Sequence, residues 1–212
     1  MNETHDVNTK DALLSAAIEV FADKGFDAAT VRDICGRANA NVAAINYHFG
    51  SKDALYVAVL EEVFPKEDRP VPVNAPPLPP EQRLRNYLRD LAGEIYERGN
   101  GMVVQRWAIF LREMAKPSHN LDFIVRRQVQ PRANELRSIL ADILGPDTPD
   151  HVLAFSSSNI WALMLDHLLI QPILERLTPL RPDIMGSIDE FVDHVTKFSL
   201  GGLNAVKGNM KG

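Results

Sequence analysis

The feature that most constrains this chain is a proline-rich segment, PKEDRPVPVNAPPLPP, at residues 65–80. It holds seven of the chain's 14 prolines. Proline lacks a backbone N–H and its ring clashes with the preceding helical turn, so no regular helix or sheet survives this density. We therefore expect an extended linker between two separately folded parts, residues 1–64 and residues 81–212.

The first part contains the patterns of four short helices. Residues 8–25 place apolar side chains at steps of three and four, and Gly25 suits the end of a helix. Three further helices are indicated by capping residues: Thr30 precedes VRDICGRA, Asn41 precedes VAAINYHF and Ser51 precedes KDALYVAVLEEVF. The short spacings predict tight turns between these helices.

The second part is also predicted to be helical throughout. Apolar periodicity covers residues 81–98, 102–116, 120–144, 149–177 and 183–206. Pro131 is expected to kink the third of these helices. Strand-like alternation and repeats of 20–50 residues are absent from the sequence, so the predicted fold class is all-α.

Composition excludes several other classes of protein. Hydrophobic residues make up 45% of the chain and charged residues 24%, as in soluble domains. The apolar run ALMLDHLLI is interrupted by Asp166 and His167, so we expect no membrane span. A polar N-terminus and a single cysteine, Cys35, favour a cytoplasmic location.

Signatures of catalysis and metal binding are also missing from the sequence. The six histidines form no HxxxH or HExxH pair and lack cysteine or carboxylate partners at ligand spacing. Glycine-rich phosphate loops, a GxSxG elbow and paired catalytic carboxylates do not occur. The sequence therefore predicts no metal, no cofactor and no enzymatic activity.

The stretch NVAAINYHFGSKDAL, residues 41–55, suits a helix-turn-helix motif. In that motif the second of two short helices enters the DNA major groove with its N-terminal residues at the base edges. A small residue such as Ala43 permits close approach, Asn46 can bond a base or phosphate, and Tyr47 and His48 can donate to phosphates. Lys52 follows at the start of a new helix, where a phosphate is also favoured.

Charge agrees with a small DNA-binding face. The chain has a formal net charge of −5, which excludes a broad polybasic surface. Within residues 30–52, however, the sequence contains three basic residues, Arg32, Arg37 and Lys52, and one acidic residue, Asp33. Of these, Arg37 is interpreted as a solvated helix-end residue rather than a base reader.

Residues 8–60 resemble the N-terminal domain of TetR-family transcriptional regulators. The resemblance is carried by three groups of residues: Phe21, Gly25 and Phe26; Thr30, Val31 and Ile34; and Tyr47, His48, Phe49, Ser51, Lys52 and Leu55. Three segments resemble one subgroup of this family, the CecR-like regulators. They are the sequence INYHFGSK, the proline-rich linker and the run REM…IVRRQVQPR…LRSIL. The family implies an N-terminal three-helix helix-turn-helix domain with the fourth helix as connector, and a larger C-terminal helical domain for ligand binding and dimerisation.

The resemblance also implies roles for individual residues. It places eight residues at the DNA: Thr30, Arg32, Val42, Ala43, Asn46, Tyr47, His48 and Lys52. Asn46 departs from the family pattern, which usually has an aromatic residue there, and this gives Asn46 a candidate base-reading role.

In the C-terminal part the family implies a ligand cavity among the helices. The candidate lining residues are Arg106, Trp107, Phe110, Trp161 and His167. For the last four, ordinary core packing remains the alternative interpretation, and for Arg106 the alternative is pairing with another polar side chain.

The last two long helices are apolar over a wide arc, which is typical of helices buried on two sides. The family implies that they form a four-helix dimer interface. Its candidate residues are Phe155, Met164, Phe191, Val195 and Phe198.

Three functional hypotheses follow. The first is a homodimeric repressor that binds a palindromic operator in double-stranded DNA and responds to an unknown small-molecule effector. The second is an activator, or a DNA-binding dimer without a ligand. The third is a helical small-molecule-binding protein or enzyme that merely carries the motif.

Overall fold

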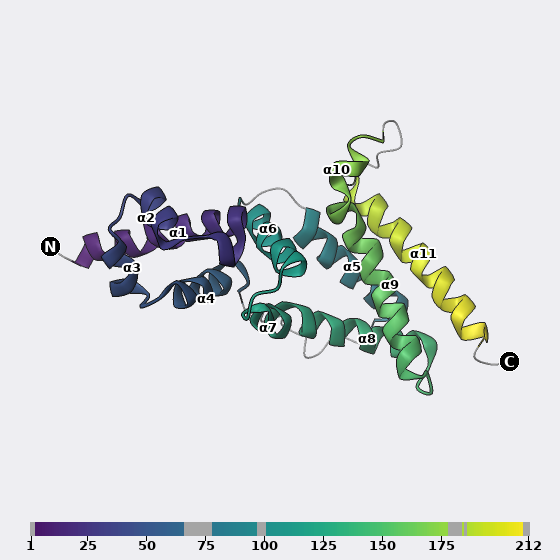
Figure 1. The fold of residues 1–212 in the computed structure, drawn as a ribbon. Helices are drawn as coiled ribbons and strands as arrows, with labels where there is room; N and C mark the ends of the chain where they lie inside the picture. The colour runs from purple at the N-terminus through teal and green to yellow at the C-terminus, as the bar shows by residue number, and fades with distance from the viewer. Residues whose placement is uncertain (1–2, 66–77, 97–100, 178–183, 185, 210–212) are drawn as a thin grey trace. The chain divides into compact units, whose positions relative to one another are not determined.

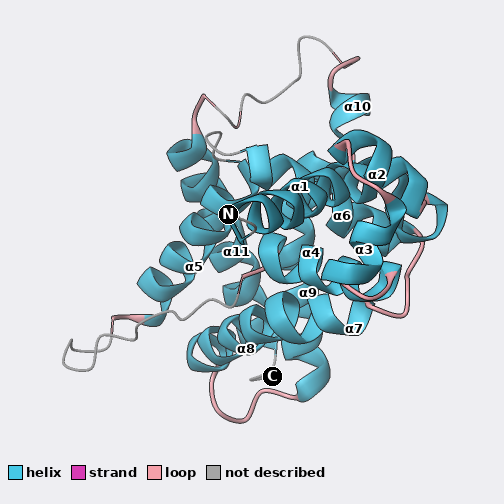
Figure 2. Cartoon of the chain, turned by 90° about the vertical axis from the view of Figure 1, so that its left-hand side faces the viewer, coloured by secondary structure: helices cyan, strands magenta, loops and turns pink. Residues whose placement is uncertain are grey.

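The computed structural model describes residues 3–65, 78–96, 101–177, 184 and 186–209 (Figure 1). Every regular element in these ranges is helical, which confirms the predicted all-α class (Figure 2). Packing divides the chain into two compact units. One comprises Met1–Arg69 with Gly99–Gln130, and the other Pro70–Arg98 with Pro131–Gly212. The predicted linker falls largely outside the described residues, since residues 66–77 are not among them.

The first unit contains helices from two stretches of the chain. Its elements are α1 (Glu3–Ala28), α2 (Val31–Ala38), α3 (Val42–His48), α4 (Lys52–Val63), α6 (Gly101–Ala115), α7 (Leu121–Ile124) and the π-helix η1 (Val125–Val129). The predicted end of α1 at Gly25 coincides with a break in helical geometry, because Gly25 has φ 74° and ψ 173°. Such a positive φ is readily adopted by glycine alone.

The core of the first unit is built around α1. This helix packs against α2, α3, α4 and α6. Large side chains buried at the centre include Leu13, Phe21, Ile34, Ile45, Leu55 and Ile109. Because Ile109 belongs to α6, the segments before residue 64 share their core with a helix from beyond the linker. The predicted boundaries thus divide the sequence differently from the way the packing divides the molecule.

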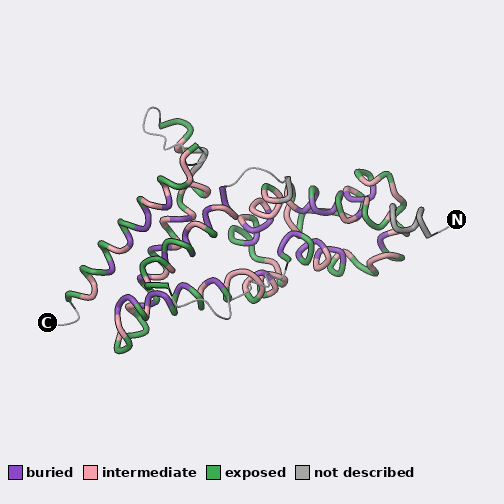
Figure 3. The backbone as a smooth tube through the Cα atoms, turned by 180° about the vertical axis from the view of Figure 1, so that it is seen from behind, coloured by how far each residue is buried: buried purple, intermediate pink, exposed green. Residues whose placement is uncertain are grey.

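The second unit is a bundle of the remaining helices. These are α5 (Pro80–Tyr96), α8 (Gln130–Leu144), α9 (Asp150–Leu169), α10 (Gln171–Leu174) and α11 (Ile188–Asn209). Helix α5 packs against α9 and α11, and buried positions recur along each of these helices (Figure 3). The Tyr96 hydroxyl donates to the Met164 carbonyl at 2.6 Å, and Lys207 Nζ donates to the Ile143 carbonyl at 2.6 Å. These bonds join α5 to α9 and α11 to α8.

The predicted helix over residues 120–144 is interrupted as the proline suggested, but by a widened segment. Residues Val125–Val129 form a π-helix between α7 and α8. Pro131 has no N–H and its ring crowds the carbonyl of Arg127, so the turn before it widens. Similarly, the predicted helix over 149–177 ends at Leu169 and is followed by the short α10.

Within the described residues, α9 is long and apolar enough to cross a membrane by length and composition. The core helix of a soluble protein passes the same test, so a single such helix is weak evidence for a membrane span. Leu153, Ile160 and Met164 bury one face of α9 inside the second unit. The other face carries the exposed Phe155.

Candidate nucleic-acid interface

Helices α2 and α3 are joined by a three-residue turn, and the residues at its two ends stabilise it. Asn39 adopts the left-handed conformation, with φ 50° and ψ 44°, and ends α2. Asparagine tolerates this region better than most residues. Asn41 then begins α3, where its side chain accepts a 3.0 Å hydrogen bond from the Ala43 N–H. The turn gives α2 and α3 the helix-turn-helix arrangement predicted from the sequence.

One face of α3 is anchored and the other is exposed. Ile45 is buried in the core of the first unit, and Phe49 packs partly against that core. On the opposite side Ala43 and Asn46 are exposed, and Tyr47 is 75% exposed. An exposed phenol ring of this size on a short helix is available to contact DNA.

Val42 and His48, at the two ends of α3, differ in exposure. Val42 is exposed at the start of α3, where the motif places base contacts. His48 is half-buried, and its ring lies 4.9 Å from that of Tyr47 and 6.4 Å from that of Phe49, centre to centre. His48 is therefore more tightly surrounded than Val42.

Thr30 begins α2 and forms a capping box with Asp33. The Asp33 N–H donates to Thr30 Oγ1 at 3.1 Å, and the Thr30 N–H donates back to Asp33 Oδ2 at 3.0 Å. Thr30 Oγ1 also donates to Asp33 Oδ2 at 2.7 Å. The only hydroxyl hydrogen of Thr30 is thus committed within the protein, so its observed role is that of a helix cap.

The Asp33 carboxylate also receives a charge from α1. Lys24 Nζ lies 2.8 Å from Asp33 Oδ1. The Lys24 ammonium, together with the two Thr30 donors, lowers the pKa of Asp33 to about 2. The start of α2 is consequently held by an ionised carboxylate at all physiological pH values.

The two arginines of α2 have different surroundings. Arg32 is exposed in the first turn, where the family resemblance places a DNA contact. Arg37 forms an ion pair with Glu19 of α1. The latter pairing agrees with the interpretation of Arg37 as a surface residue rather than a base reader.

The start of α4 carries the candidate phosphate site. Gly50 has φ 82° and turns the chain, and Ser51 Oγ then caps α4 by accepting from the Ala54 N–H at 3.1 Å. Lys52 Nζ lies 4.4 Å from the centre of the Phe26 ring, in a cation–π contact with α1. The first-turn N–H groups of a helix have no intrahelical partner and favour an anion.

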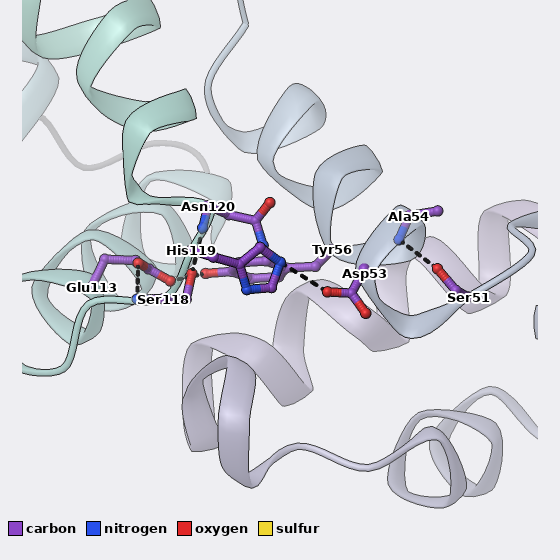
Figure 4. Close-up of polar contacts among 8 residues, drawn as sticks. All are labelled: Ser51, Asp53, Ala54, Tyr56, Glu113, Ser118, His119 and Asn120. Atoms are coloured by element: carbon purple, nitrogen blue, oxygen red, sulfur yellow. Dashed lines mark hydrogen bonds and ion pairs between the residues drawn. The ribbon is translucent and has the colours of Figure 1, made fainter.

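Two polar contacts tie α4 to the end of α6 and the turn that follows it (Figure 4). The Tyr56 hydroxyl donates to Glu113 Oε1 at 2.7 Å, and the Ser118 N–H donates to Glu113 Oε2 at 2.9 Å. His119 Nε2 lies 2.9 Å from Asp53 Oδ1. Burial, followed by the bonded Glu113 carboxylate, raises the pKa of Tyr56, so this hydroxyl remains a donor.

The sequence patterns did not foresee these contacts. Tyr56 and Glu113 are 57 positions apart, and neither belongs to a local motif. Glu113 is only 3% exposed, although a carboxylate in an amphipathic helix usually faces solvent. A glutamate beside the apolar stripe of α6 was the only available signal.

The five candidate ligand-binding residues lie in different units. Arg106 Nε donates to the Val63 carbonyl at 2.6 Å and so satisfies the end of α4. Phe110 is buried in the core of the first unit, with the Trp107 ring 5.3 Å away. Trp161 and His167 belong to α9 in the second unit.

His167 is partly enclosed beside an aromatic side chain. Its ring centre is 5.5 Å from that of Phe191, and its Nδ1 has no hydrogen-bond partner among the described residues. Burial lowers the pKa of His167, which favours the neutral ring. A cavity of about 550 Å³ in the same unit is lined instead by residues 144–149 and Lys207.

The candidate dimer residues divide into exposed and buried ones. Phe155 of α9 is 69% exposed and Phe198 of α11 is 63% exposed. Met164 and Val195 are buried within the second unit, and Phe191 is half-buried beside Tyr96. Met164 and Val195 therefore pack inside the protomer, and among the five candidates Phe155 and Phe198 have the most exposed side chains.

Two family models match this chain, one on each side of the proline-rich segment. Residues 13–59 match the bacterial regulatory proteins of the tetR family. Residues 80–203 match the C-terminal domain of the HTH-type transcriptional dual regulator CecR. The second match covers more than half of the chain.

Curated relatives agree with these matches. The HTH-type transcriptional repressor NicS of Pseudomonas putida is 39% identical over 56 residues, which are 26% of this chain and 26% of NicS. The HTH-type transcriptional dual regulator CecR of Shigella flexneri is 28% identical over 150 residues, 66% of this chain and 67% of CecR. The chain thus spans only about a quarter of NicS but about two thirds of CecR.

Solved structures share the fold along nearly the whole chain. HlyIIR, a hemolysin II transcriptional regulator, is 19% identical with a TM-score of 0.61, covering 90% of this chain and 98% of HlyIIR. A TetR transcriptional regulator from Agrobacterium tumefaciens is 16% identical with a TM-score of 0.60, covering 93% of each chain. With the helix-turn-helix geometry of α2 and α3 and the two family matches, these findings show that the chain belongs to the TetR family of transcriptional regulators, with a C-terminal domain of the CecR type.

Proposed function

We propose that this protein is a homodimeric repressor that binds a near-palindromic operator through α2 and α3 and releases it when a small molecule binds. The observation that carries the proposal is the division of α3 into an anchored and an exposed face. Ile45 fixes the helix to the core, while Ala43, Asn46 and Tyr47 lie exposed. Such a helix can enter the major groove without disturbing the fold.

Within this interface we assign base reading to the start of α3 and phosphate binding to its surroundings. Val42 and Ala43 are small enough to lie against base edges, and Asn46 can bond an adenine edge. Tyr47 and His48 donate hydrogen bonds to phosphate oxygens. Arg32 approaches from α2, and Lys52 with the start of α4 receives a further phosphate.

The proposed palindromic operator requires a two-fold dimer, and we place its interface on α9 and α11. Exposed Phe155 and Phe198 give these helices an apolar outer face, which a second copy of the chain would cover. A two-fold dimer presents its two recognition helices to half-sites about 34–36 Å apart. The same arrangement leaves α9 within a soluble assembly rather than a membrane, as expected for a cytoplasmic protein.

Release by an effector requires a difference in binding between two conformations. An effector lowers operator affinity tenfold if it binds the released conformation about 1.4 kcal/mol more tightly. We place its site among the helices that follow the linker, within one of the two units. The candidates are Arg106, Trp107 and Phe110 in the first unit, or Trp161 and His167 in the second. No catalytic step belongs to this proposal.

Activation at some promoters is the second candidate function. It is favoured by one observation: the matching C-terminal domain is that of CecR, which is named a dual regulator. A protein that only activates would raise transcription from a reporter carrying its operator, whereas the proposed repressor lowers it.

Selection of bound DNA from a random library tests the proposal directly. The protein is first stripped of small molecules, and the selected sequences are retested at two salt concentrations. A palindromic consensus is expected, with binding lost in the variant Tyr47→Ala/Lys52→Ala while helicity is retained. No enrichment over bulk DNA by the stripped protein would overturn the proposal.

A further inference from the structure

The start of α4 combines groups that attract a phosphate with one that repels it. Lys52 and the first-turn N–H groups that Ser51 does not bind favour an anion, but Asp53 places a carboxylate beside them. An acidic residue in the first turn stabilises the helix through its dipole. The same charge opposes the approach of DNA unless another group compensates it.

His119 provides that compensation from the turn between α6 and α7. Its Nε2 lies 2.9 Å from Asp53 Oδ1 and 3.1 Å from Asn120 Nδ2. We place the Nε2 hydrogen toward Asp53, since a carboxylate is an acceptor only. With this tautomer the Asn120 amide nitrogen, itself a donor, contacts Nε2 without a hydrogen bond. The Asp53 carboxylate then accepts a hydrogen bond from the His119 ring.

The Phe26 ring connects this pair to Lys52. Lys52 Nζ lies 4.4 Å from the ring centre of Phe26, and the His119 ring meets Phe26 edge-on at 5.3 Å. Aromatic side chains bind cations over their faces and other rings at their edges. One phenyl ring of α1 therefore supports both the phosphate-binding lysine and the partner of Asp53.

The turn that carries His119 is itself fixed to α4. The Ser118 N–H bonds Glu113, which also accepts from Tyr56, three residues after Asp53 on the same helix (Figure 4). Glu113 is buried, so this attachment is shielded from solvent. His119 is thus placed by the fold rather than by the surface ion pair alone.

We propose that His119 is a positioning residue for operator binding, which holds the Asp53 carboxylate away from the phosphate received by Lys52 and the start of α4. The inference rests on the proposed function, because it needs DNA at that helix end. It extends the interface to a turn some seventy positions beyond the motif, which the helix-turn-helix sequence does not contain.

Exposure of the pair makes the inference testable without unfolding the protein. The side chains of His119 and Asp53 are 63% and 58% exposed. Exposed ion pairs add little to folding stability, so His119→Ala should leave the urea midpoint nearly unchanged. Operator affinity at low salt should fall by about threefold to tenfold, since an uncompensated charge then faces the phosphate.

A double-mutant cycle shows whether His119 acts through Asp53. We expect His119→Ala to have no further effect in an Asp53→Asn background, where the charge to be compensated is gone. The neighbouring Lys116 pairs with Asp27 at 2.7 Å, so Lys116→Ala removes a cation from the same turn and serves as the control. Equal losses for His119→Ala in both backgrounds, or an equal loss for Lys116→Ala, would overturn the inference.

A conservative variant adds a readout that a purely structural role would not change. His119→Gln keeps a side-chain N–H donor in this exposed turn without adding a charge. It should recover part of the operator affinity that His119→Ala loses, with the urea midpoint unchanged in both variants. Operator binding by His119→Gln as weak as that of His119→Ala would contradict the inference.

Lys52→Ala separates this inference from the function on which it rests. A loss of affinity is expected there. If Lys52→Ala binds the selected operator as tightly as wild type, the proposed phosphate site fails. If Lys52→Ala loses affinity but His119→Ala does not, only the role of His119 is wrong.

Discussion

The short helices α2–α4 differ from the long helices α9 and α11 in the exposure of their large apolar side chains, and from α9 in side-chain capping at the N-terminus. In α3 the large aliphatic residue Ile45 is buried, and each of α2, α3 and α4 begins with a side-chain cap. Helix α9 begins at Asp150, and Pro149 at its N-cap provides no side-chain hydrogen bond. It exposes Phe155, and α11 exposes Phe198.

In this chain, some sequence features determine local structure, such as the start of a helix, and others determine which surfaces remain exposed to another molecule. Caps and turns fix where each short helix starts, so these starts depend on neighbouring residues alone, although α6 completes the core beneath them. Large apolar side chains exposed on two long helices are typical of an interaction surface. We attribute that surface to a second copy of the chain, and the following experiments test the distinction.

The largest effect is expected from charging the exposed face of the long helices. The double variant Phe155→Arg/Phe198→Arg should be monomeric by light scattering, because two desolvated arginines oppose association. Operator affinity should fall by about 10² to 10⁴, since each half-site then binds alone. Far-UV circular dichroism should stay unchanged, as neither side chain belongs to the core.

Asn134→Arg is the matched control for added charge, on an exposed position of α8. It should remain dimeric and bind the operator. A Phe155→Arg/Phe198→Arg protein that is still dimeric would show that another surface joins the subunits.

Neighbouring residues of α3 should show the second largest effect and separate folding from binding. Ile45→Ala should lower the free energy of unfolding by about 2–5 kcal/mol, because it leaves a cavity in the core. Tyr47→Ala, at a 75% exposed position, should change that free energy by less than about 0.5 kcal/mol. Urea unfolding and operator titration of both variants check this; a large loss of stability in Tyr47→Ala would contradict the exposed placement of α3.

Removing one buried hydroxyl should produce a smaller change in stability. Tyr56→Phe deprives Glu113 Oε1 of its 2.7 Å donor while Oε2 keeps the Ser118 N–H. A partly unsatisfied buried carboxylate costs about 1–3 kcal/mol, measured as a shift in urea unfolding. Tyr47→Phe removes an exposed hydroxyl instead and should leave stability unchanged; equal effects of both variants would argue against the Tyr56–Glu113 bond.

The same distinction explains what could be predicted from the sequence. Thr30, Asn41 and Ser51 were predicted as caps because capping depends on residues within three positions. The π-helix before Pro131 was predicted only as a kink, since a proline disturbs a helix without specifying how the chain relaxes. Family motifs located the candidate DNA contacts, although they did not reveal that the Thr30 hydroxyl is donated to Asp33.

Contacts between distant segments lay beyond sequence reasoning. Periodicity indicates that α6 has an apolar face but not which helices it covers, so its place beside α1 and α4 was unforeseen. For the same reason Met164 and Val195 were assigned to a dimer surface although they pack inside the protomer. A wide apolar arc does not say which part of it faces the core.

The smallest effect tests the caps through pH. Lys24 and Thr30 lower the pKa of Asp33 from 3.8 to about 2 in the folded protein. Its folded pKa is thus below its unfolded pKa, so its stabilisation is fully present above pH 4 and is lost as the pH falls through about 2. Asp33→Asn should therefore be less stable than wild type at pH 5, with the difference shrinking toward pH 2 in urea unfolding. Asp150→Asn is the control from the uncapped helix α9, where the aspartate side chain is 89% exposed and takes no part in a cap. Because Asp150 pairs instead with Arg137 at 2.6 Å, Asp150→Asn shows the effect of losing an exposed ion pair at a helix start that has no side-chain cap. For Asp33→Asn, a stability difference that stays constant between pH 5 and pH 2 would mean that the ionised carboxylate does not stabilise the start of α2.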